Sequence, residues 1–440
     1  MGIEGFHSFI EKDYPEAYHN INTTTQLYHH VYIDLNYILH LCHFNSNDEV
    51  HLINKMSLLI LDICAKTQPV ISLNLYCDGT APFAKMVIQR ERRSINIKES
   101  DDIYKTSLNF TPGTKFIKEL PKKLNKIIKI IREQFCIEVN VDSIEAGEAE
   151  IKIKNKLLEL YNKNKTHNHL LVTNDADVVI ILCATDTYKK SYILLRDKVL
   201  SMDRLIKEHF KIYFSNLAHN ISHTSDKSDT INLDFVFLNV FLGNDYIPKI
   251  SQISAKKLWE CYRLNINEHK YLLKITKKDN KNIFDINKQF LIDILNDCIA
   301  QIGRNKIIKN NTIYNKHDFD NYFKGILWTI DMYNVGKCND YSYICENKKP
   351  IDILNFVLYL NSLEDINMYI HHMIDPIASI LCGIFLLPKD AQELIDEKYQ
   401  DFMKDDDVKV IYNKDFKITN DYLKKIVNKF NLYEKILIRL

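Results

Sequence analysis

The stretch that decides the fold reads EAGEAEIKIK at residues 145–154 and HLLVTNDADVVIILC at residues 169–183. Residues 169–173 are apolar and run into a polar turn, which predicts a short buried strand. Asp175 and Asp177 follow it, and side chains two positions apart in extended backbone project to the same side. We therefore expect both carboxylates at the carboxyl end of a strand, where open α/β sheets carry their active sites.

Glu148 and Glu150 lie at the opening of a predicted helix, directly before its pattern IKIKNKLLELY at residues 151–161. Acids in a first helical turn complement the helix dipole, and Asp residues after a strand are ordinary in a polar turn. Each of the four acids therefore has a structural explanation when it is taken singly. Two close pairs of carboxylates beside apolar strand-forming sequence favour a metal site when they are taken together.

Two further predicted strands also end in Asp. Residues 30–33 (HVYI) precede Asp34, and residues 70–77 (VISLNLYC) precede Asp78. Three hydrophobic strands separated by helical patterns predict a parallel sheet whose carboxyl edge is lined with carboxylates. Such acids repel one another unless cations neutralise them.

Composition sets the class of protein. The chain has 440 residues, 46% hydrophobic and 26% charged, which is typical of a soluble globular protein with two or three domains. The formal net charge of +1 means that any nucleic-acid affinity must come from a local patch. Ten cysteines without a CxxC pair or a signal peptide predict free thiols in a reducing, intracellular and most simply cytoplasmic setting. The longest apolar run, residues 178–184, is too short to span a bilayer, so no membrane partner is expected.

A local basic excess occurs between Lys85 and Arg132, with thirteen Lys or Arg against five Asp or Glu. Within it, Lys85, Gln89, Arg92 and Arg93 lie at helical spacings and could hold a phosphate, because guanidinium forks and ammonium charges suit phosphate oxygens. The alternative is a solvated basic helix face.

Three other segments have plain structural interpretations. Residues 121–135 predict an amphipathic helix whose wet face carries Lys122, Lys126 and Lys129. Residues 215–232 are polar and aperiodic, which indicates a surface loop. Residues 233–242 predict a buried helix, and Asp245 lies in the turn after it.

Five segments in order along the chain resemble the signature segments of the Xrn family of 5′→3′ exoribonucleases. They are VYIDLNYILH (31–40), YCDGTAPFAKMVIQRERR (76–93), EAGEAEIKIK (145–154), TNDADVVIIL (173–182) and FLNVFLGNDYIP (237–248). The resemblance implies a PIN/FEN-like α/β nuclease domain with a central, mostly parallel twisted sheet flanked by helices. A largely helical second conserved region is implied after it, in a compact form compatible with a viral origin.

By the same resemblance, seven acids hold two Mg²⁺ ions, for which Mn²⁺ is able to substitute, and oxygen ligands suit both metals. Those acids are Asp34, Asp78, Glu148, Glu150, Asp175, Asp177 and Asp245. Lys85, Gln89, Arg92 and Arg93 match the pocket for a 5′-monophosphate, and Asn36 and His40 match substrate-binding residues. His40 would stack on the terminal base, whereas the residue alone suggests a helix-buried histidine. The implied reaction degrades single-stranded RNA with a 5′-monophosphate end to nucleoside 5′-monophosphates by two-metal hydrolysis.

The sequence predicts a nuclease domain at residues 1–250, a helical connector at 251–318 and a mostly helical region at 319–440. Residues 319–334 predict a strong helix, and residues 319–390 resemble the family's second conserved region. Tyr341-Ser342-Tyr343 occupies the place of a Trp-x-Trp stretch. These tyrosines would either stack bases or serve as core aromatics.

Two rival functions remain open. A flap-type structure-specific DNA nuclease shares the acids and much of the fold, but such enzymes follow the last acid with a Gly-x-Gly hairpin where this chain has PKISQIS at 248–254. Without those glycines, close approach to duplex is less favoured. A non-cleaving nucleic-acid-binding scaffold is the other rival, and the intact acids argue against it, because they would repel phosphates.

Overall fold

The computed structural model describes residues 6–23, 25–96, 106–214, 230–266, 269, 271–279, 281–303, 315–346, 349–364, 374–413 and 419–437. The chain divides into two compact units, each built from separate stretches of sequence. Unit 1 comprises Met1–Thr25, Lys154–Lys337 and Ile344–His372, and unit 2 comprises Gln26–Ile153, Cys338–Tyr343 and Met373–Leu440. These units do not follow the boundaries predicted at residues 250 and 318.

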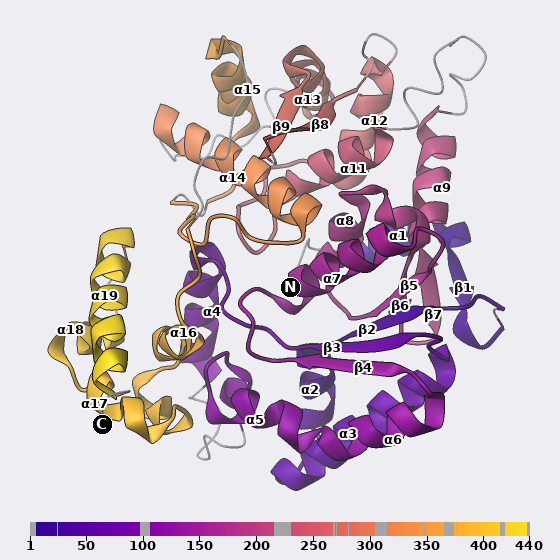
Figure 1. The fold of residues 1–440 in the computed structure, drawn as a ribbon. Helices are drawn as coiled ribbons and strands as arrows, with labels where there is room; N and C mark the ends of the chain where they lie inside the picture. Colours follow the sequence, from indigo (N-terminus) through magenta and orange to yellow (C-terminus); the bar gives the residue numbers. More distant parts are fainter. Residues whose placement is uncertain are drawn as a thin grey trace. The chain divides into compact units, whose positions relative to one another are not determined.

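Unit 2 contains three parallel strands in the order β2-β3-β4, namely β2 (His30–Asp34), β3 (Ser72–Tyr76) and β4 (Glu138–Asp142). Every residue of β2 and β3 is buried, as expected of parallel strands covered on both faces. The helices α2 (Leu35–His43), α3 (Glu49–Thr67) and α6 (Asn125–Phe135) lie along one face of these strands (Figure 1). The sequence had predicted β2 and β3 but not β4, whose residues alternate between exposed and buried.

The rest of unit 2 is helical. Helix α4 (Phe83–Asn96) packs against α16 (Ser379–Leu386), and Arg90 of α4 donates to the carbonyl oxygens of Phe385 and Ile411. The predicted helix at residues 121–135 is divided at the buried Leu124 between α5 (Lys115–Lys123) and α6, and its three lysines are exposed as expected. The C-terminal helices are α17 (Gln400–Met403), α18 (Asp406–Lys409) and α19 (Asn420–Leu437).

Unit 1 contains four strands in the order β1-β7-β6-β5, namely β1 (Tyr18–Asn20), β5 (His169–Val172), β6 (Ser191–Leu195) and β7 (Lys198–Ser201). Strands β5 and β6 are parallel, whereas β7 pairs antiparallel with both β6 and β1. Helix α7 (Ala149–Lys163) precedes β5, helix α8 (Asp177–Cys183) follows it, and helix α9 (Met202–Phe214) follows β7.

The remaining elements of unit 1 include a hairpin that the sequence did not predict. The helices are α1 (Phe6–Asp13), α11 (Ile231–Val240), α12 (Ala255–Asn265), α13 (Lys288–Ile302), α14 (Lys316–Val335) and α15 (Ile353–Ser362). The expectation of an entirely helical connector at 251–318 was wrong, because β8 (Leu273–Lys278) and β9 (Lys281–Ile286) form an antiparallel pair inside it. Their alternation of apolar and polar residues has the period of a strand.

The predicted strong helix at residues 319–334 is confirmed as α14, which begins with a capping box between Asn315 and Asp318. Of the predicted loop at 215–232, residues 215–229 lie outside the described residues and Ile231 already begins α11. Short 3-10 turns lie at Pro15–Ala17, Ile21–Thr23, Ser107–Phe110, Asp186–Lys190, Lys389–Leu394, Glu397–Tyr399 and Val410–Tyr412.

All ten cysteines are free thiols, as predicted. Among the helices that the structure describes, none is both long and apolar enough to cross a membrane.

A fully buried lysine stands out in unit 1. The Nζ atom of Lys154 donates to Thr185 Oγ1 at 2.5 Å, to Thr187 Oγ1 at 3.0 Å and to Leu182 O at 3.4 Å. Because burial disfavours the charged ammonium, the pKa of Lys154 is lowered to about 7. Among the described residues, the hydrogen-bond partners of this ammonium are neutral oxygens at and after the C-terminal end of α8.

We expect the free energy of unfolding to rise between pH 7 and pH 8, below the range in which thiols of the unfolded chain ionise. Above pH 7 the folded chain releases the Lys154 proton, whereas the unfolded chain keeps it, so the unfolded state binds more protons and stability increases with pH. The slope is at most about 1.4 kcal/mol per pH unit. Urea unfolding at several pH values measures it. Lys154→Met should remove the rise, whereas the control Lys163→Met, an exposed position on the same helix, should retain it; a rise that survives Lys154→Met would contradict the assignment.

Candidate active site

Two of the predicted acids of unit 2 are linked by an asparagine. Asp34 is the last residue of β2, and its Oδ1 atom accepts the backbone N–H groups of Asn36 at 2.8 Å and Tyr37 at 3.2 Å, which caps α2. Asn36 in turn donates to Asp78 Oδ2 at 3.2 Å and accepts the Asp78 N–H at 2.9 Å. The pattern DxN therefore ties the carboxyl ends of β2 and β3 together.

The loop after β3 approaches the start of α7 closely. Asp78 Oδ1 accepts the N–H of Ala149 at 3.0 Å, and Gly79 donates to the carbonyl oxygen of Gly147 at 2.8 Å. A Cβ atom at Gly79 would lie 1.8 Å from the carbonyl oxygen of Glu145, so only glycine fits there. This contact brings the segment that carries Glu148 and Glu150 to the strand end.

Helix α4 adds a cation to the same group of residues. Lys85 Nζ lies 2.5 Å from Glu148 Oε2, and the exposed fractions of the two side chains are only 12% and 6%. Gln89 lies one turn further along and is buried, and its Oε1 atom has no hydrogen-bond partner among the described residues. Arg93 donates from Nε to Thr111 Oγ1 at 2.8 Å, and Arg92 is half-buried. Helix α4 therefore offers one cation to the acids and an unsatisfied amide oxygen next to it.

His40 lies on α2, one turn beyond Asn36. It is exposed, so the alternative of a helix-buried histidine was wrong. Its ring packs edge-to-face on Phe110, with a centroid distance of 5.5 Å. Partial desolvation lowers the pKa of His40, an effect that Asp78 opposes. A neutral, exposed imidazole ring is suited to stacking on a planar group.

In unit 1, the expected extended geometry of Asp175 and Asp177 was wrong. Asp177 begins helix α8, and its N–H donates to Asp175 Oδ1 at 3.0 Å. All seven residues of α8 are buried, and a short run that is apolar on every side has no period by which helix and strand can be told apart. The two acids are thus linked by a hydrogen bond at the start of a helix and do not lie two positions apart on an extended strand.

Asp245 lies in the turn after α11, as predicted. Gly243 has a φ of +84°, and the Asn244 side chain accepts the N–H groups of Tyr246 at 2.8 Å and Ile247 at 3.0 Å. Asp245 itself is buried, with an exposed fraction of 8%. Local turn chemistry therefore fixes the position of this carboxylate within unit 1.

Four of the seven predicted acids lie in unit 2 and three in unit 1, and their assembly into one metal centre stays a prediction. Within the described residues, no group of three or more His, Cys, Asp or Glu side chains is arranged to hold a metal ion. The four predicted ligands of unit 2 are all carboxylates. That donor chemistry fits Mg²⁺ or Mn²⁺ better than zinc or copper.

Sequence reasoning missed a second ion pair beside this site. Lys152 Nζ donates to Asp142 Oδ2 at 2.6 Å and to Glu145 O at 3.1 Å. Burial alone would raise the pKa of Asp142, but the Lys152 ammonium and backbone donors outweigh burial and lower it. The signal was an Asp at the end of a fourth strand, which went unnoticed because β4 itself was not predicted.

The tyrosines in the place of the Trp-x-Trp stretch support the start of α4. The carbonyl oxygens of Tyr341 and Tyr343 accept the N–H groups of Phe83 at 2.9 Å and Ala84 at 3.0 Å. Tyr341 is buried, with an exposed fraction of 8%, which favours the core interpretation for its ring. Tyr343 is half-buried, and its role stays open.

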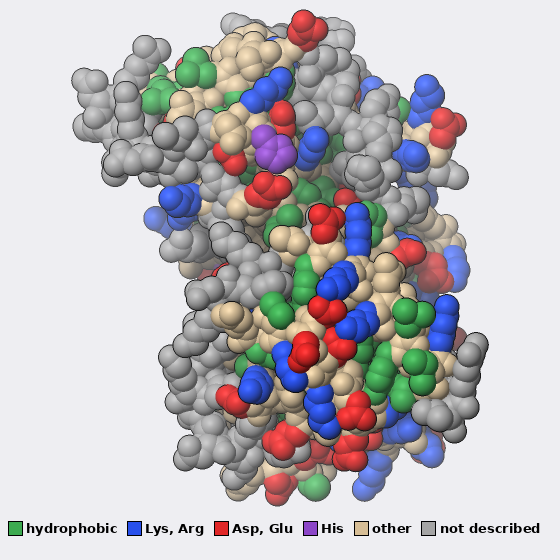
Figure 2. Space-filling view, turned by 90° about the vertical axis from the view of Figure 1, so that its left-hand side faces the viewer, with side chains coloured by type: hydrophobic (Ala, Val, Ile, Leu, Met, Phe, Trp, Pro, Cys, Tyr) green, Lys and Arg blue, Asp and Glu red, His purple; other side chains and the backbone are tan. Residues whose placement is uncertain are grey.

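Basic side chains are not segregated on the face that carries the C-terminal helices. Lys and Arg are interspersed there with Asp and Glu (Figure 2). Lys425 pairs with Asp407 at 2.7 Å, and Lys429 pairs with Asp405 at 2.6 Å. Such a mixed surface has no large field of one sign to attract a polyanion.

Comparison with known proteins shows a similarity in the first part of the chain. Residues 1–198 match the family model described as the XRN 5′-3′ exonuclease N-terminus. The 5′-3′ exoribonuclease 1 of Saccharomyces cerevisiae is 26% identical over 306 residues, covering 58% of this chain and 20% of the relative. The human 5′-3′ exoribonuclease 1 is 23% identical over 305 residues, covering 58% of this chain and 18% of the relative. The chain thus spans about a fifth of the length of these relatives.

Among solved structures, the catalytic core of Rad2 in complex with DNA substrate is similar at a TM-score of 0.40, with 13% identity, 82% of this chain covered and 93% of that chain covered. The family match and the acid-bearing strand ends agree on the same segments of sequence. Residues 1–198 are therefore similar to the N-terminal part of the XRN 5′-3′ exonucleases.

Proposed function

We propose that this protein is a 5′→3′ exoribonuclease that degrades single-stranded RNA carrying a 5′-monophosphate and releases nucleoside 5′-monophosphates. The observation that carries the proposal is the contact group of unit 2, in which Asp78 is bonded to the start of α7 and Lys85 is bonded to Glu148. Carboxylates and a lysine at this distance suit phosphate chemistry, because the acids can hold divalent cations and the lysine can meet a phosphate oxygen.

The donor set supports divalent metal ions, with Mg²⁺ as the first candidate and two as their proposed number. When bound, such ions would lower the pKa of water and stabilise the charge that develops on the leaving oxygen. In unit 2 the residues proposed to hold them are Asp34, Asp78, Glu148 and Glu150, and in unit 1 Asp175, Asp177 and Asp245.

The other residues of α2 and α4 are proposed to bind and orient the RNA end. Lys85, Gln89, Arg92 and Arg93 would hold the terminal phosphate, and Gln89 would do so by donating from its amide nitrogen. His40 would stack on the first base from its exposed place on α2. Asn36 would act indirectly, because its hydrogen bonds already hold Asp78 in place.

The test compares four substrates of one sequence: linear RNA with a 5′-phosphate labelled at the 5′ end, the same RNA labelled at the 3′ end, circular RNA, and single-stranded DNA. We expect the 5′ label to appear at once as mononucleotide, the circle to resist, and DNA to react slowly. EDTA should stop the reaction and added Mg²⁺ should restore it.

Three outcomes would contradict the proposal. Cleavage of the circle would indicate an endonuclease, and equal rates on DNA and RNA would favour the flap-type alternative. Binding of RNA without any Mg²⁺-dependent product would favour the scaffold.

A further inference from the structure

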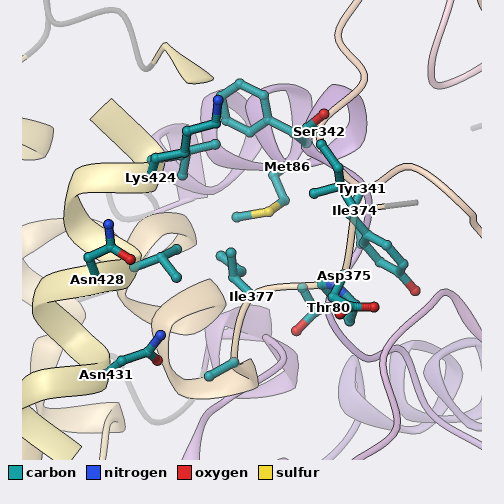
Figure 3. A pocket seen from close by; sticks show the side chains of 16 residues that line it. Thr80, Met86, Tyr341, Ser342, Ile374, Asp375, Ile377, Lys424, Asn428 and Asn431 are labelled. Atoms are coloured by element: carbon teal, nitrogen blue, oxygen red, sulfur yellow. The ribbon is translucent and has the colours of Figure 1, made fainter. Parts of the chain in front are cut away.

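Unit 2 contains a cavity of about 500 Å³ that the proposed chemistry does not use. It lies between the start of α4, residues 374–378 and helix α19 (Figure 3). Its volume falls within the range of roughly 300 to 1,000 Å³ that is typical of small-molecule sites. It is therefore large enough to accommodate a ligand of nucleotide size on its partly open surface.

The lining combines an apolar interior with a polar stripe. Phe83, Met86 and Ile377 provide apolar surface, and helix α19 contributes Lys424, Asn428 and Asn431 to the lining, at spacings of four and three residues (Figure 3). Among the residues that the structure describes, none forms a hydrogen bond or ion pair with these three side chains of α19. Because these three side chains are exposed, their polar groups are accessible to a ligand that enters from solvent.

The cavity is close in sequence and in space to the proposed phosphate chemistry. Thr80 and Ala81, which line it, follow Asp78 by two and three residues. Met86 follows Lys85 on α4, so the same helix turns one face to the acids and the neighbouring face to the cavity. Tyr341 also lines the cavity. Burial is the main cause that raises the pKa of the Tyr341 phenol, and the charge of Glu148 adds to this effect.

We propose that this cavity binds a nucleoside 5′-monophosphate unit, an inference that rests on the proposed function and adds a nucleotide subsite to it. The Met86 thioether and the Phe83 ring would contact the flat faces of the base, as sulfur and aromatic groups do favourably. The amides of Asn428 and Asn431 carry both donors and acceptors, which matches the mixed edge of a nucleobase.

Charge fixes the orientation of that unit. Lys424 and Asp375 lie on opposite sides of the cavity (Figure 3). The phosphate would therefore be directed to the Lys424 ammonium, and a base amino group toward the Asp375 carboxylate. The nucleotide would be either a residue of the RNA strand or the released product, which share this chemistry.

The experiment uses the full chain carrying Arg92→Ala, so that the proposed 5′-phosphate pocket does not contribute, and titrates it with adenosine 5′-monophosphate and with ribose 5-phosphate. We expect the mononucleotide to bind more tightly than the sugar phosphate. Adding Asn428→Leu and Asn431→Leu should weaken mononucleotide binding at least about tenfold, as loss of two hydrogen-bonding groups implies. The matched control Leu432→Ala, an exposed position on α19 outside the cavity, should leave binding unchanged.

Both asparagines are exposed, so the double variant should keep the native fold, which its unfolding curve checks. The double variant is also tested in the chain with Arg92 intact. A higher KM for RNA would mean that the subsite holds a nucleotide of the RNA strand. An unchanged KM with weaker inhibition by mononucleotide would mean that it holds the released product. Mononucleotide binding that the double variant does not change, or that is absent from the Arg92→Ala chain, overturns the subsite. RNA degradation without such binding removes the subsite only, whereas binding without RNA degradation removes the proposed function only.

Discussion

Replacement of Asp175 by Asn is expected to lower the rate of RNA degradation roughly a thousandfold or more while RNA binding changes little. Loss of one group that stabilises charge in a transition state commonly lowers the rate by a factor of up to about a thousand, and we expect loss of a metal ligand to lower it further. Asn keeps the shape of the side chain, and its amide oxygen can still accept the N–H of Asp177 that Asp175 Oδ1 accepts at 3.0 Å. The start of α8 should therefore survive, and the substitution removes the charge alone. Single-turnover rates and equilibrium RNA binding measure the two effects separately.

The matched control for this variant is Asp186→Asn. Asp186 is an exposed acid of unit 1 that forms an ion pair with Lys189 at 3.7 Å. A surface pair of this kind contributes little, so the control should degrade RNA at the rate of the unaltered chain. If Asp175→Asn also retained that rate, Asp175 would have no part in the reaction.

Replacement of Arg92 by Ala is expected to abolish the preference for one kind of RNA end. The unaltered chain should degrade 5′-phosphorylated RNA roughly 10 to 100 times faster than 5′-hydroxyl RNA, as one or two charge-assisted hydrogen bonds imply. In Arg92→Ala this ratio of kcat/KM values should fall close to one, because Lys85 already has Glu148 as a partner at 2.5 Å. RNA with a 5′-triphosphate should be a poor substrate for both chains.

Lys126→Ala is the control for the basic stretch as a whole. Lys126 lies on the exposed face of α6, within the same run of positive charge, and should not influence the choice of RNA end. A similar loss of preference in Lys126→Ala would mean that the basic stretch acts through its general charge. Equal rates of the unaltered chain on phosphate and hydroxyl ends would remove the pocket entirely.

The sequence was sufficient to predict the strands that are apolar on both faces. β2, β3 and β5 stand out because every residue of each is buried, and each is followed by an acid within a few positions. β1, β4, β7 and the β8–β9 hairpin were missed, because they are short or partly exposed and their residues carry many polar side chains. Such strands show too little hydrophobic periodicity to be predicted from the sequence.

The site was predictable as a set of residue types but not as a set of contacts. The sequence indicated that Asp34 and Asp78 lie at an edge of a sheet, and the family resemblance added Glu148 to them. The reciprocal bonds of Asn36 and the pair of Lys85 with Glu148 depend on tertiary structure. Asp142 and Lys152 went unnoticed for the same reason. Asp177 was placed on a strand because an all-apolar run conceals the helix it begins.

The two hydrogen bonds from Arg90 to the carbonyl oxygens of Phe385 and Ile411 have a consequence for truncated forms of this protein. Every proposed metal ligand occurs before residue 250, so a fragment ending there would retain the whole set of reactive groups. It would nevertheless lack the C-terminal segment of unit 2. Helix α4 would lose its packing against α16, and the turn at Pro112 and Gly113 would lose its contact with Gly383. A truncated chain designed from the motifs alone would thus retain the proposed reactive residues but lose the segment that packs against α4.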